Sequence, residues 1–417
     1  MSILLLNNAN KNFFIKKYIT LKIEVAYYHN KIYNQTMNKL PNDWRELPFS
    51  ECVNKISIKY KIKQKYYLKN GKYPIIDQGQ NFISGYSNDK ITINIKKPVI
   101  VFGDHTRCFK YIDFDFIAGA DGIQILEPKE FFNEKLFYYF CLILDFPNKG
   151  YSRHYQYLAK TIIKIPPLAI QKQIAEKLDY SFDKIDKTLT FLKENKEYIK
   201  KYRLSILKYA FEGKLTPSSK NWKMKTLGEV CEINPKNKLD DNLEVSFIPM
   251  NLISDKFQNK FSYKIKNWKD VKKGYTHLQN NCIALAKITP CFENGKCVIL
   301  RNLKNGYGAG TTELIILLPN SKKIIIEYIF YFMNTQHFIE QGKRNFKGSV
   351  GQLRIGTDFV SNYKIPIPNI ETQKEIVLIL DKKFKAMDEI ERLNNENIEN
   401  LLLLKKSLLK EAFSGKL

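Results

Sequence analysis

The chain contains one long stretch twice. Residues 171–215 align without a gap with residues 373–417, and 18 of the 45 aligned pairs are identical. A proline turn precedes each copy, at Pro166-Pro167 and at Pro366-Ile367-Pro368. Because a domain's length of chain separates the two copies, the repeat predicts a duplicated architecture.

Each copy has the pattern of a long helix. In the first copy apolar residues recur mostly three or four positions apart, at Ile174, Leu178, Phe182, Ile185, Leu189, Leu192, Ile199 and Tyr202. This spacing forms one stripe along an α-helix, and no Pro or Gly interrupts it before Gly213. Gly213 and Gly415 are typical helix stops, and the prolines can stand just before a helix.

A helix of this length needs a partner. About 42 helical residues would span roughly 60 Å at about 1.5 Å per residue, and one such helix cannot bury its apolar stripe alone. We therefore expect the two helices to face each other, antiparallel, as a coiled-coil spacer. Two separate interaction helices, or two core helices, are the alternatives.

The length and charge of the chain favour several domains and a polyanionic partner. A chain of 417 residues with 27 Phe and 25 Tyr has material for two to three domains with real cores. Its 68 basic and 42 acidic residues leave a net charge of +26, which favours nucleic acid and predicts salt-sensitive binding. The alternative is a Lys-rich proteome, because Lys, Asn and Ile are abundant throughout.

Cysteine usage and hydropathy predict a cytoplasmic protein without a metal. The 7 Cys are scattered and form no C-x-x-C, and the 5 His show no metal-ligand spacing. Unpaired thiols suit a reducing compartment. No apolar run has the length of a transmembrane helix, and Ile3–Leu6 is too short for the core of a signal peptide.

The segments around the helices read as two related globular domains of mixed α/β type, because short β-type runs alternate with Gly, Asn and Asp turns. Trp44–Glu51 and Trp222–Glu229 share their Trp-to-Glu spacing, and His105–Phe109 parallels Ile288–Phe292. Two similar domain frameworks with different loops suggest two related domains that recognise different targets.

The Asn/Lys-rich leader receives no function, although Met37 begins a phrase that looks like a natural start. The expected divisions are a leader 1–36, a first globe 37–165, a helix region 166–215, a linker 216–221, a second globe 222–363 and a final helix region 364–417.

The catalytic motifs that we considered are missing. No P-loop occurs, and Gly306-x-Gly308-x-Gly310 lacks the strand-then-helix frame of a dinucleotide site. The Asn/Asp-Pro-Pro-aromatic motif of an amino-methyltransferase and a convincing nuclease cluster are also missing. We therefore expect a protein that is not an enzyme.

Polar loops supply the candidate nucleic-acid contacts. Lys287–Lys296 presents ammonium and amide groups around a Pro and a Gly, although it also reads as a structural turn anchored by Phe292. Lys343–Arg354, with its counterpart Arg153–Gln156, carries Arg and Gln, which can pair with guanine and adenine in the major groove. A tight turn or a solvated loop is the alternative reading of each. The full candidate set is Gln78, Gln80, Asn81, His105, Arg107, Arg153, His154, Gln156, Lys287, Thr289, Asn294, Lys296, Thr311, Thr312, Lys343, Arg344, Lys347, Gln352 and Arg354.

Over Lys39–Leu417 the chain resembles the specificity subunit of type I restriction-modification systems. The shared phrases are Trp222-x5-Gly228-Glu229, Ala286–Lys296, Gly310-Thr-Thr-Glu313, the Ile-Pro-x-Pro and Gln-Lys helix entries and the Ala-Phe-x-Gly-Lys-Leu ends. The resemblance implies that each globe is a target-recognition domain reading one half of a bipartite, asymmetric DNA site. It also implies that the helices are spacers that pair and dock two methyltransferase (modification) subunits. The leader before Met37 lies outside the pattern.

The same resemblance implies chemistry on partner chains. N6-adenine methylation and ATP-driven cleavage would belong to the modification and restriction subunits, so S-adenosylmethionine, ATP and Mg are expected there and no cofactor on this chain. Phe211 and Phe413, on the apolar face left after helix pairing, are the predicted docking residues. The first globe has Phe102-Gly-Asp-His-Thr106 where the second has Lys287-Ile-Thr-Pro, so residue roles cannot be copied between globes.

Two other protein classes are the alternatives. A stand-alone methyltransferase-nuclease would need the motifs that are missing. A coiled-coil scaffold or RNA-binding module predicts sequence-indifferent binding with a steep salt slope. The spacer interpretation predicts instead that helical turns added or removed within 180–205 change the gap in a two-part DNA target.

Overall fold

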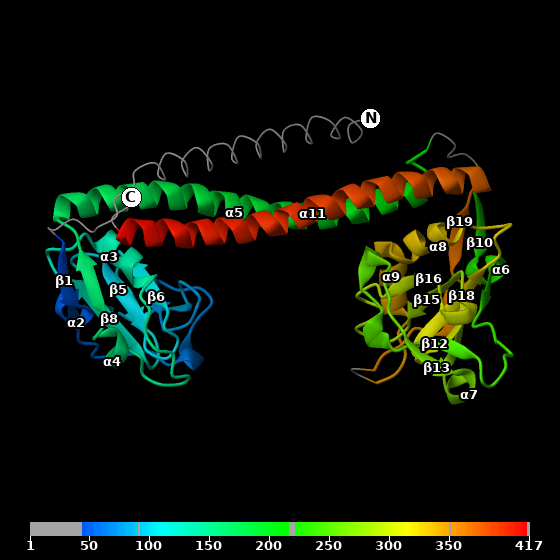
Figure 1. Cartoon of the computed structure of the whole chain (residues 1–417), viewed down its shortest axis with the longest axis horizontal. Helices are drawn as coiled ribbons and strands as arrows, with labels where there is room; N and C mark the ends of the chain where they lie inside the picture. The colour runs from blue at the N-terminus through cyan, green and yellow to red at the C-terminus, as the bar shows by residue number, and fades with distance from the viewer. Residues whose placement is uncertain (1–43, 91, 217–221, 350–351, 415–417) are drawn as a thin grey trace. The chain divides into compact units, whose positions relative to one another are not determined.

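The repeated stretch forms two long helices, α5 (Leu168–Phe211) and α11 (Ile370–Phe413), of 44 residues each. They belong to a computed structural model that describes residues 44–90, 92–216, 222–349 and 352–414. The predicted leader and start at Met37, most of the linker, and the helix stop at Gly415 lie outside the described residues. The chain divides into two compact units, Met1–Phe191 with Glu396–Leu417, and Leu192–Asn395. Each unit holds one globe and part of both long helices (Figure 1).

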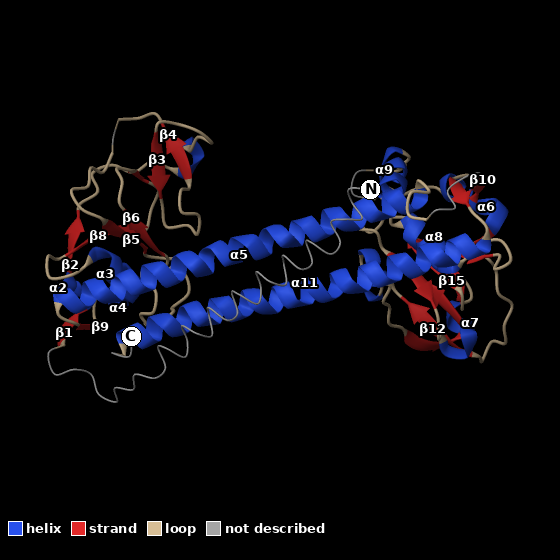
Figure 2. Ribbon diagram, turned by 90° about the horizontal axis from the view of Figure 1, so that it is seen from above, coloured by secondary structure: helices blue, strands red, loops and turns tan. Residues whose placement is uncertain are grey.

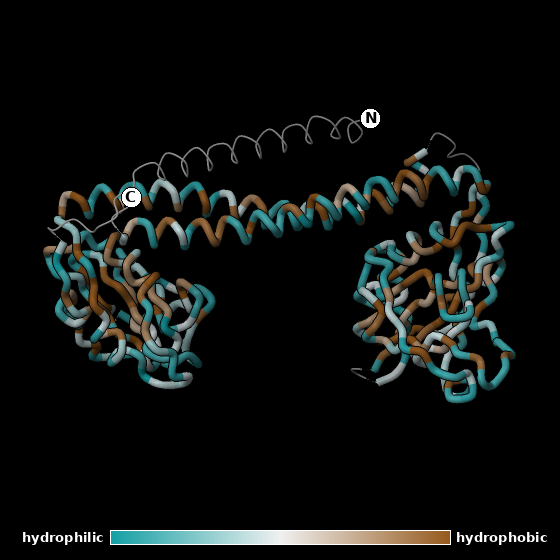
Figure 3. The backbone as a smooth tube through the Cα atoms, viewed as in Figure 1, coloured by the Kyte–Doolittle hydropathy of each residue, from teal (hydrophilic) through white to brown (hydrophobic). Residues whose placement is uncertain are grey.

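The first globe contains three small sheets. Its elements are β1 (Arg45–Pro48), α2 (Phe49–Cys52), β2 (Val53–Ile56), η1 (Gln64–Tyr66), β3 (Tyr73–Ile76), β4 (Gly85–Ser87), β5 (Val99–Gly103), β6 (Phe109–Ile112), β7 (Ile117–Ala118), β8 (Ile123–Pro128), α3 (Glu134–Cys141), α4 (Tyr155–Leu158) and β9 (Ile162–Ile165). The strands pair in the orders β2-β8-β5-β6, β4-β3-β7 and β1-β9. Strand β5 is buried along its whole length because it is apolar on both faces (Figure 3).

The second globe repeats this topology. Its elements are β10 (Lys223–Thr226), α6 (Leu227–Val230), β11 (Cys231–Ile233), β12 (Glu244–Ile248), η2 (Met250–Leu252), η3 (Lys256–Gln258), β13 (Lys264–Asn267), α7 (Trp268–Val271), β14 (Thr276–Gln279), β15 (Cys282–Ala286), β16 (Cys297–Leu300), η4 (Lys304–Gly306), β17 (Tyr307–Gly310), β18 (Leu314–Pro319), α8 (Ile326–Met333), α9 (Gln336–Arg344), α10 (Thr357–Ser361) and β19 (Lys364–Ile367). The orders β11-β18-β15-β16, β13-β12-β17-β14 and β10-β19 correspond strand by strand to the first globe, except that β14 has only an isolated bridge as counterpart. The prediction of two related mixed α/β globes is confirmed.

Within each unit, the segments of the two long helices lie side by side and run antiparallel (Figure 2). In the first unit Lys405 Nζ lies 2.8 Å from both carboxylate oxygens of Asp186. In the second unit Arg203 Nη2 lies 2.6 Å from Asp388 Oδ1. These are one interaction encoded twice, because Asp186 matches Asp388 and Arg203 matches Lys405 in the repeat. The cations also lie over matching rings, Lys405 at 4.6 Å from that of Phe182 and Arg203 at 5.3 Å from that of Phe384.

Other repeated residues fasten each long helix to the globe that precedes it. Gln373 is fully buried, and its Oε1 accepts a hydrogen bond from the N–H of Ile325 at the start of α8 (2.9 Å). Gln171 does the same for Asn133 at the start of α3 (2.8 Å). In addition, the hydroxyl of Tyr331 donates to Asp381 (2.6 Å), as Tyr139 does to Asp179. The identities in the repeat therefore encode anchoring as well as pairing.

Phe211 and Phe413 require a correction. The Phe211 ring packs edge-on against Tyr328 and Phe332 of α8, with centroids 5.0 and 5.1 Å away. The Phe413 ring stacks on Phe140 of α3 at 3.7 Å and is buried. Both rings are therefore used inside their own units, where they close each helix end onto a globe. Phe413 is therefore not free to dock a partner as the sequence predicted, whereas Phe211 is half-buried.

Candidate nucleic-acid interface

In the first globe the loop after β5 meets the segment before α4. The carbonyl of Asp104 accepts hydrogen bonds from the backbone N–H of His154 (2.9 Å) and from its Nδ1 (2.8 Å). His105 Nδ1 lies 3.1 Å from the carbonyl of Ser152. The predicted contacts around His105 and around Arg153, which are distant in sequence, are therefore neighbours.

In the second globe the loop after β15 meets the segment before α10 in the same way, and we call this meeting of two segments the junction of each globe. The side chains at the two junctions differ. The carbonyl of Lys287 accepts from the N–H of Ile355 (3.0 Å), as Asp104 accepts from His154. The N–H of Lys287 donates to the carbonyl of Glu313 (2.9 Å), and that of Thr289 to Leu353 (2.9 Å). The three candidate loops of this globe, Lys287–Lys296, Gly310–Glu313 and Lys343–Arg354, thus converge.

A third loop of the first globe, between β3 and β4, is held beside His105. Thr106 Oγ1 donates to the carbonyl of Gln78 (2.5 Å), and the N–H of His105 to Gln78 Oε1 (3.3 Å). Lys110 is 4% exposed, and its ammonium donates to the carbonyls of Asp77 (2.8 Å) and Asn81 (2.6 Å). Burial lowers the pKa of Lys110, and the nearby Asp77 carboxylate opposes that shift. One buried lysine therefore fixes the loop that carries Gln78, Gln80 and Asn81.

Three predicted contact residues instead hold these loops in place. His154 is 1% exposed, and its Nε2 accepts a hydrogen bond from the N–H of Lys149 (3.2 Å) while its Nδ1 bonds Asp104. Arg107 donates to the carbonyl of Phe146 (2.8 Å) and lies over that ring. Arg354 binds both carboxylate oxygens of Glu313 (2.8 and 2.9 Å), and this hydrogen bonding lowers the pKa of Glu313. The burial of His154 excludes it from a contact surface.

The remaining candidates differ in how free they are. Lys343 pairs with Glu293 (3.3 Å), Lys296 donates to the carbonyl of Met250 (3.1 Å), and Thr311 accepts from the N–H of Glu313 (3.3 Å). Lys287 and Thr289 are half-buried at the junction. The exposed candidates are Gln80, Asn81, Arg153, Gln156, Asn294, Thr312, Lys343, Arg344, Lys347 and Gln352. Phe292 is 1% exposed, so its loop is also the core-anchored turn of the alternative reading.

Two features were missed at the sequence level. Residues 59–72 of the first globe carry exposed lysines, among them Lys63 and Lys65, next to Tyr60 and Tyr66, which are also exposed. Basic residues interleaved with aromatics are a signal for nucleic-acid binding that was available in the sequence. The second feature is Tyr151, 90% exposed and stacked on His105 at 4.6 Å. Its stacking partner is distant in sequence, so no local pattern indicated it.

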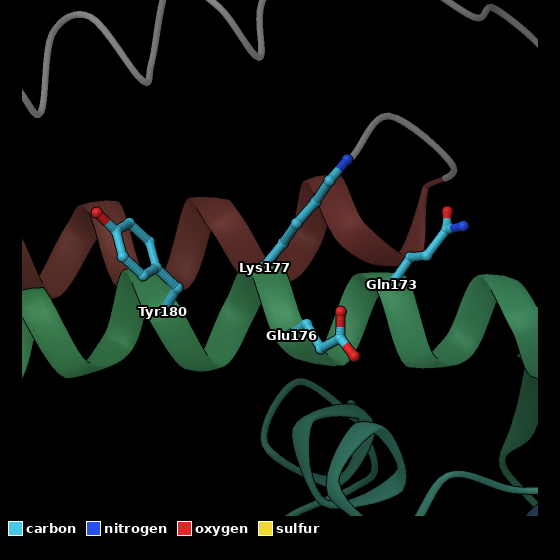
Figure 4. A pocket seen from close by; sticks show the side chains of 4 residues that line it. All are labelled: Gln173, Glu176, Lys177 and Tyr180. Carbon is cyan, nitrogen blue, oxygen red and sulfur yellow. The ribbon is translucent and has the colours of Figure 1, made fainter.

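A further depression lies on α5. It has a volume of about 430 Å³ and is lined by Gln173, Glu176, Lys177 and Tyr180, whose side chains project from one helix and do not converge (Figure 4). Among the residues that the structure describes, no three His, Cys, Asp or Glu side chains are grouped as a metal site would require. No helix within the described ranges is long and apolar enough to cross a membrane.

The sequence matches a known family over both halves. Residues 41–201 and 219–400 match the family described as the Type I restriction modification DNA specificity domain. The chain belongs to this family. The resemblance seen in the sequence motifs is thereby confirmed.

Individual family members match to different extents. The specificity subunit of type I restriction enzyme EcoAI from Escherichia coli is 45% identical over 172 residues, which cover 41% of this chain and only 29% of that protein. The StySPI specificity subunit from Salmonella potsdam is 24% identical over 428 residues, covering 91% of this chain and 90% of that protein. A chain from a structure of a type I restriction-modification system, solved to explain complex assembly, has a TM-score of 0.65 at 15% identity and covers 91% of this chain and 100% of that chain. That likeness shows a shared fold.

Proposed function

We propose that the chain is the DNA-specificity subunit of a type I restriction-modification complex and that each globe reads one half of a bipartite, asymmetric target. One observation carries the proposal. The two globes have the same topology and the same backbone junction. The residues at equivalent positions of the junction differ: they are Asp104 and Gly122 in the first globe and Lys287 and Glu313 in the second. A common frame with different side chains at one place is what two readers of different sequences require.

The charge of the chain supports DNA as the partner. A net charge of +26 favours a phosphate backbone, and exposed cations such as Arg153, Arg344 and Lys347 lie on the loops that converge at the junctions or next to them. Phosphate contacts of this kind supply affinity and register, whereas the side chains at the junctions would supply base readout.

The long helices would serve as spacer and as docking surface. We propose that two methyltransferase subunits bind the helix pair and that the restriction subunits join through them. S-adenosylmethionine, ATP and Mg would then bind to those subunits, and this chain would recognise DNA without catalysis. With Phe211 and Phe413 used internally, the docking candidates are apolar side chains that stay exposed after pairing, namely Leu378, Leu402 and Leu403 of α11.

Adenine methylation of host DNA tests the proposal. The chain would be expressed with the modification subunit of its own system, and methylated adenines would be mapped by single-molecule sequencing with the chain present and deleted. We expect a two-part motif with a fixed gap that disappears on deletion. Methylation that is unaffected by the deletion would refute the specificity role. It would favour a scaffold or a sequence-indifferent nucleic-acid binder.

A further inference from the structure

Gln78 and His105 of the first globe meet over one glycine. Gly122 has a φ of +83°, and a Cβ built there would lie 2.6 Å from His105 Cδ2 and 2.8 Å from Gln78 Oε1. A side chain at this position would displace both polar groups, so the glycine at position 122 allows them to lie together. Both side chains are half-buried at the edge of the globe.

The surroundings fix which groups these side chains offer. His105 Nδ1 lies 3.1 Å from the carbonyl of Ser152, which can only accept, so Nδ1 donates there; in that tautomer Nε2 is an acceptor. Gln78 Oε1 accepts from the N–H of His105, so its Nε2 is left to donate. In the described part of the chain, neither Nε2 has a hydrogen-bond partner. The junction therefore presents one acceptor and one donor.

This pair matches one base. In the major groove adenine presents the N6 donor beside the N7 acceptor, guanine presents two acceptors, cytosine one donor, and thymine one acceptor with a methyl group. We propose that Gln78 and His105 read one adenine of the half-site bound by the first globe. Gln78 Nε2 donates to N7, and His105 Nε2 accepts from N6. This inference rests on the proposed function and names the residues and the base.

Tyr151 is the positioning residue of this pair. Its ring stacks on His105 at 4.6 Å with an interplanar angle of 9°, which holds the imidazole plane from the solvent side. It is 90% exposed, so it contributes no core contact that would explain its place. At the junction of the second globe, Arg354 and Glu313 form an ion pair instead. We therefore assign the adenine reader to the first globe.

The substitution Gln78→Glu tests the inference, because it keeps the shape and replaces the donor by an acceptor. The full chain is expressed with its modification subunit, and the methylated motif is mapped as above. We expect the preference for adenine at one A·T position of one half-site to fall about 5- to 150-fold, the value of a bidentate base contact. The other half-site is an internal control. Gln173→Glu, an exposed position on α5, is the charge-matched control and leaves the motif unchanged.

Tyr151 provides the second arm. Tyr151→Ala relaxes the same A·T position, and Tyr151→Phe, which keeps the stack, restores it. If Gln78→Glu does not fold, the Tyr151 variants decide the question by themselves. Because Tyr151 is exposed, its substitution removes no buried surface. A wild-type two-part motif that both Gln78→Glu and Tyr151→Ala leave unchanged overturns the inference while the proposed function stands. Relaxation at a G·C position also overturns it. Absence of any two-part motif with the wild-type chain overturns the proposed function itself.

Discussion

Substitution of Gln373 by leucine tests the anchoring of the long helices. The two residues have similar volumes, so the change leaves no large cavity. It does remove every hydrogen bond of a fully buried side chain. Oε1 accepts from the N–H of Ile325, and Nε2 donates to the carbonyls of Pro368 (2.9 Å) and Lys323 (3.2 Å).

The expected cost follows from the groups left without partners. Each buried polar group that loses its hydrogen bond costs about 1–3 kcal/mol. With one N–H and two carbonyls affected, and partial compensation at the carbonyls, we expect Gln373→Leu to lower the free energy of unfolding by about 3 kcal/mol. Since 1.4 kcal/mol is a factor of ten, hydrogen exchange of the α8 amides in the second globe should accelerate roughly 100-fold.

Hydrogen exchange with mass spectrometry on the full chain measures this effect, with peptides from the first globe as an internal reference. The control is Gln173→Leu, an exposed position on α5, for which we expect a change within about 0.5 kcal/mol. If Gln373→Leu folds and exchanges like the wild type, the anchoring role assigned to the repeated glutamines is wrong.

Two further predictions concern pH and salt. Burial raises the pKa of Tyr67, Tyr111 and Tyr138 to about 12. The tyrosines of the unfolded chain ionise near pH 10, whereas these three stay neutral in the folded chain until about pH 12. Their contribution to the free energy of unfolding is therefore fully present below about pH 10 and is lost as the pH rises toward about 12. Urea unfolding between pH 9 and 11.5 checks this, and constant stability over that range contradicts it. Arg344→Ala should weaken DNA binding evenly across sequences and reduce the slope of log K against log salt by about 1, measured by salt titration on a duplex. A change in base preference instead would mean that Arg344 reads bases.

The sequence predicted the elements whose signal is local or repeated. The apolar stripe and the proline turns identified both long helices, and repetition itself identified their pairing. Spacing phrases such as Trp44–Glu51 and Trp222–Glu229 identified the two globes, because they mark the same strand-to-helix corner at β1–α2 and β10–α6.

What the sequence could not predict depends on contacts between distant residues. The sequence shows that Phe413 lies on an apolar helix face but not that Phe140 is the ring that covers it. His154 has the composition of a contact residue, and only its bond to Asp104, 50 positions earlier, makes it structural. Tyr151 became a candidate because it stacks on His105. Periodicity identifies the apolar face of an element, whereas the topology of the fold decides which element packs against that face.

The central claim is that two readers are separated by a helical spacer, and a matched insertion tests it most directly. Seven residues are added to α5 after Glu194 and seven to α11 after Glu396, so that the Asp186–Lys405 and Arg203–Asp388 pairs both keep their partners. Seven helical residues add about 10 Å, or about three base pairs at roughly 3.4 Å each. The methylation motif should keep both half-sites and gain about three base pairs between them. An unchanged gap in an active, folded variant would contradict the account.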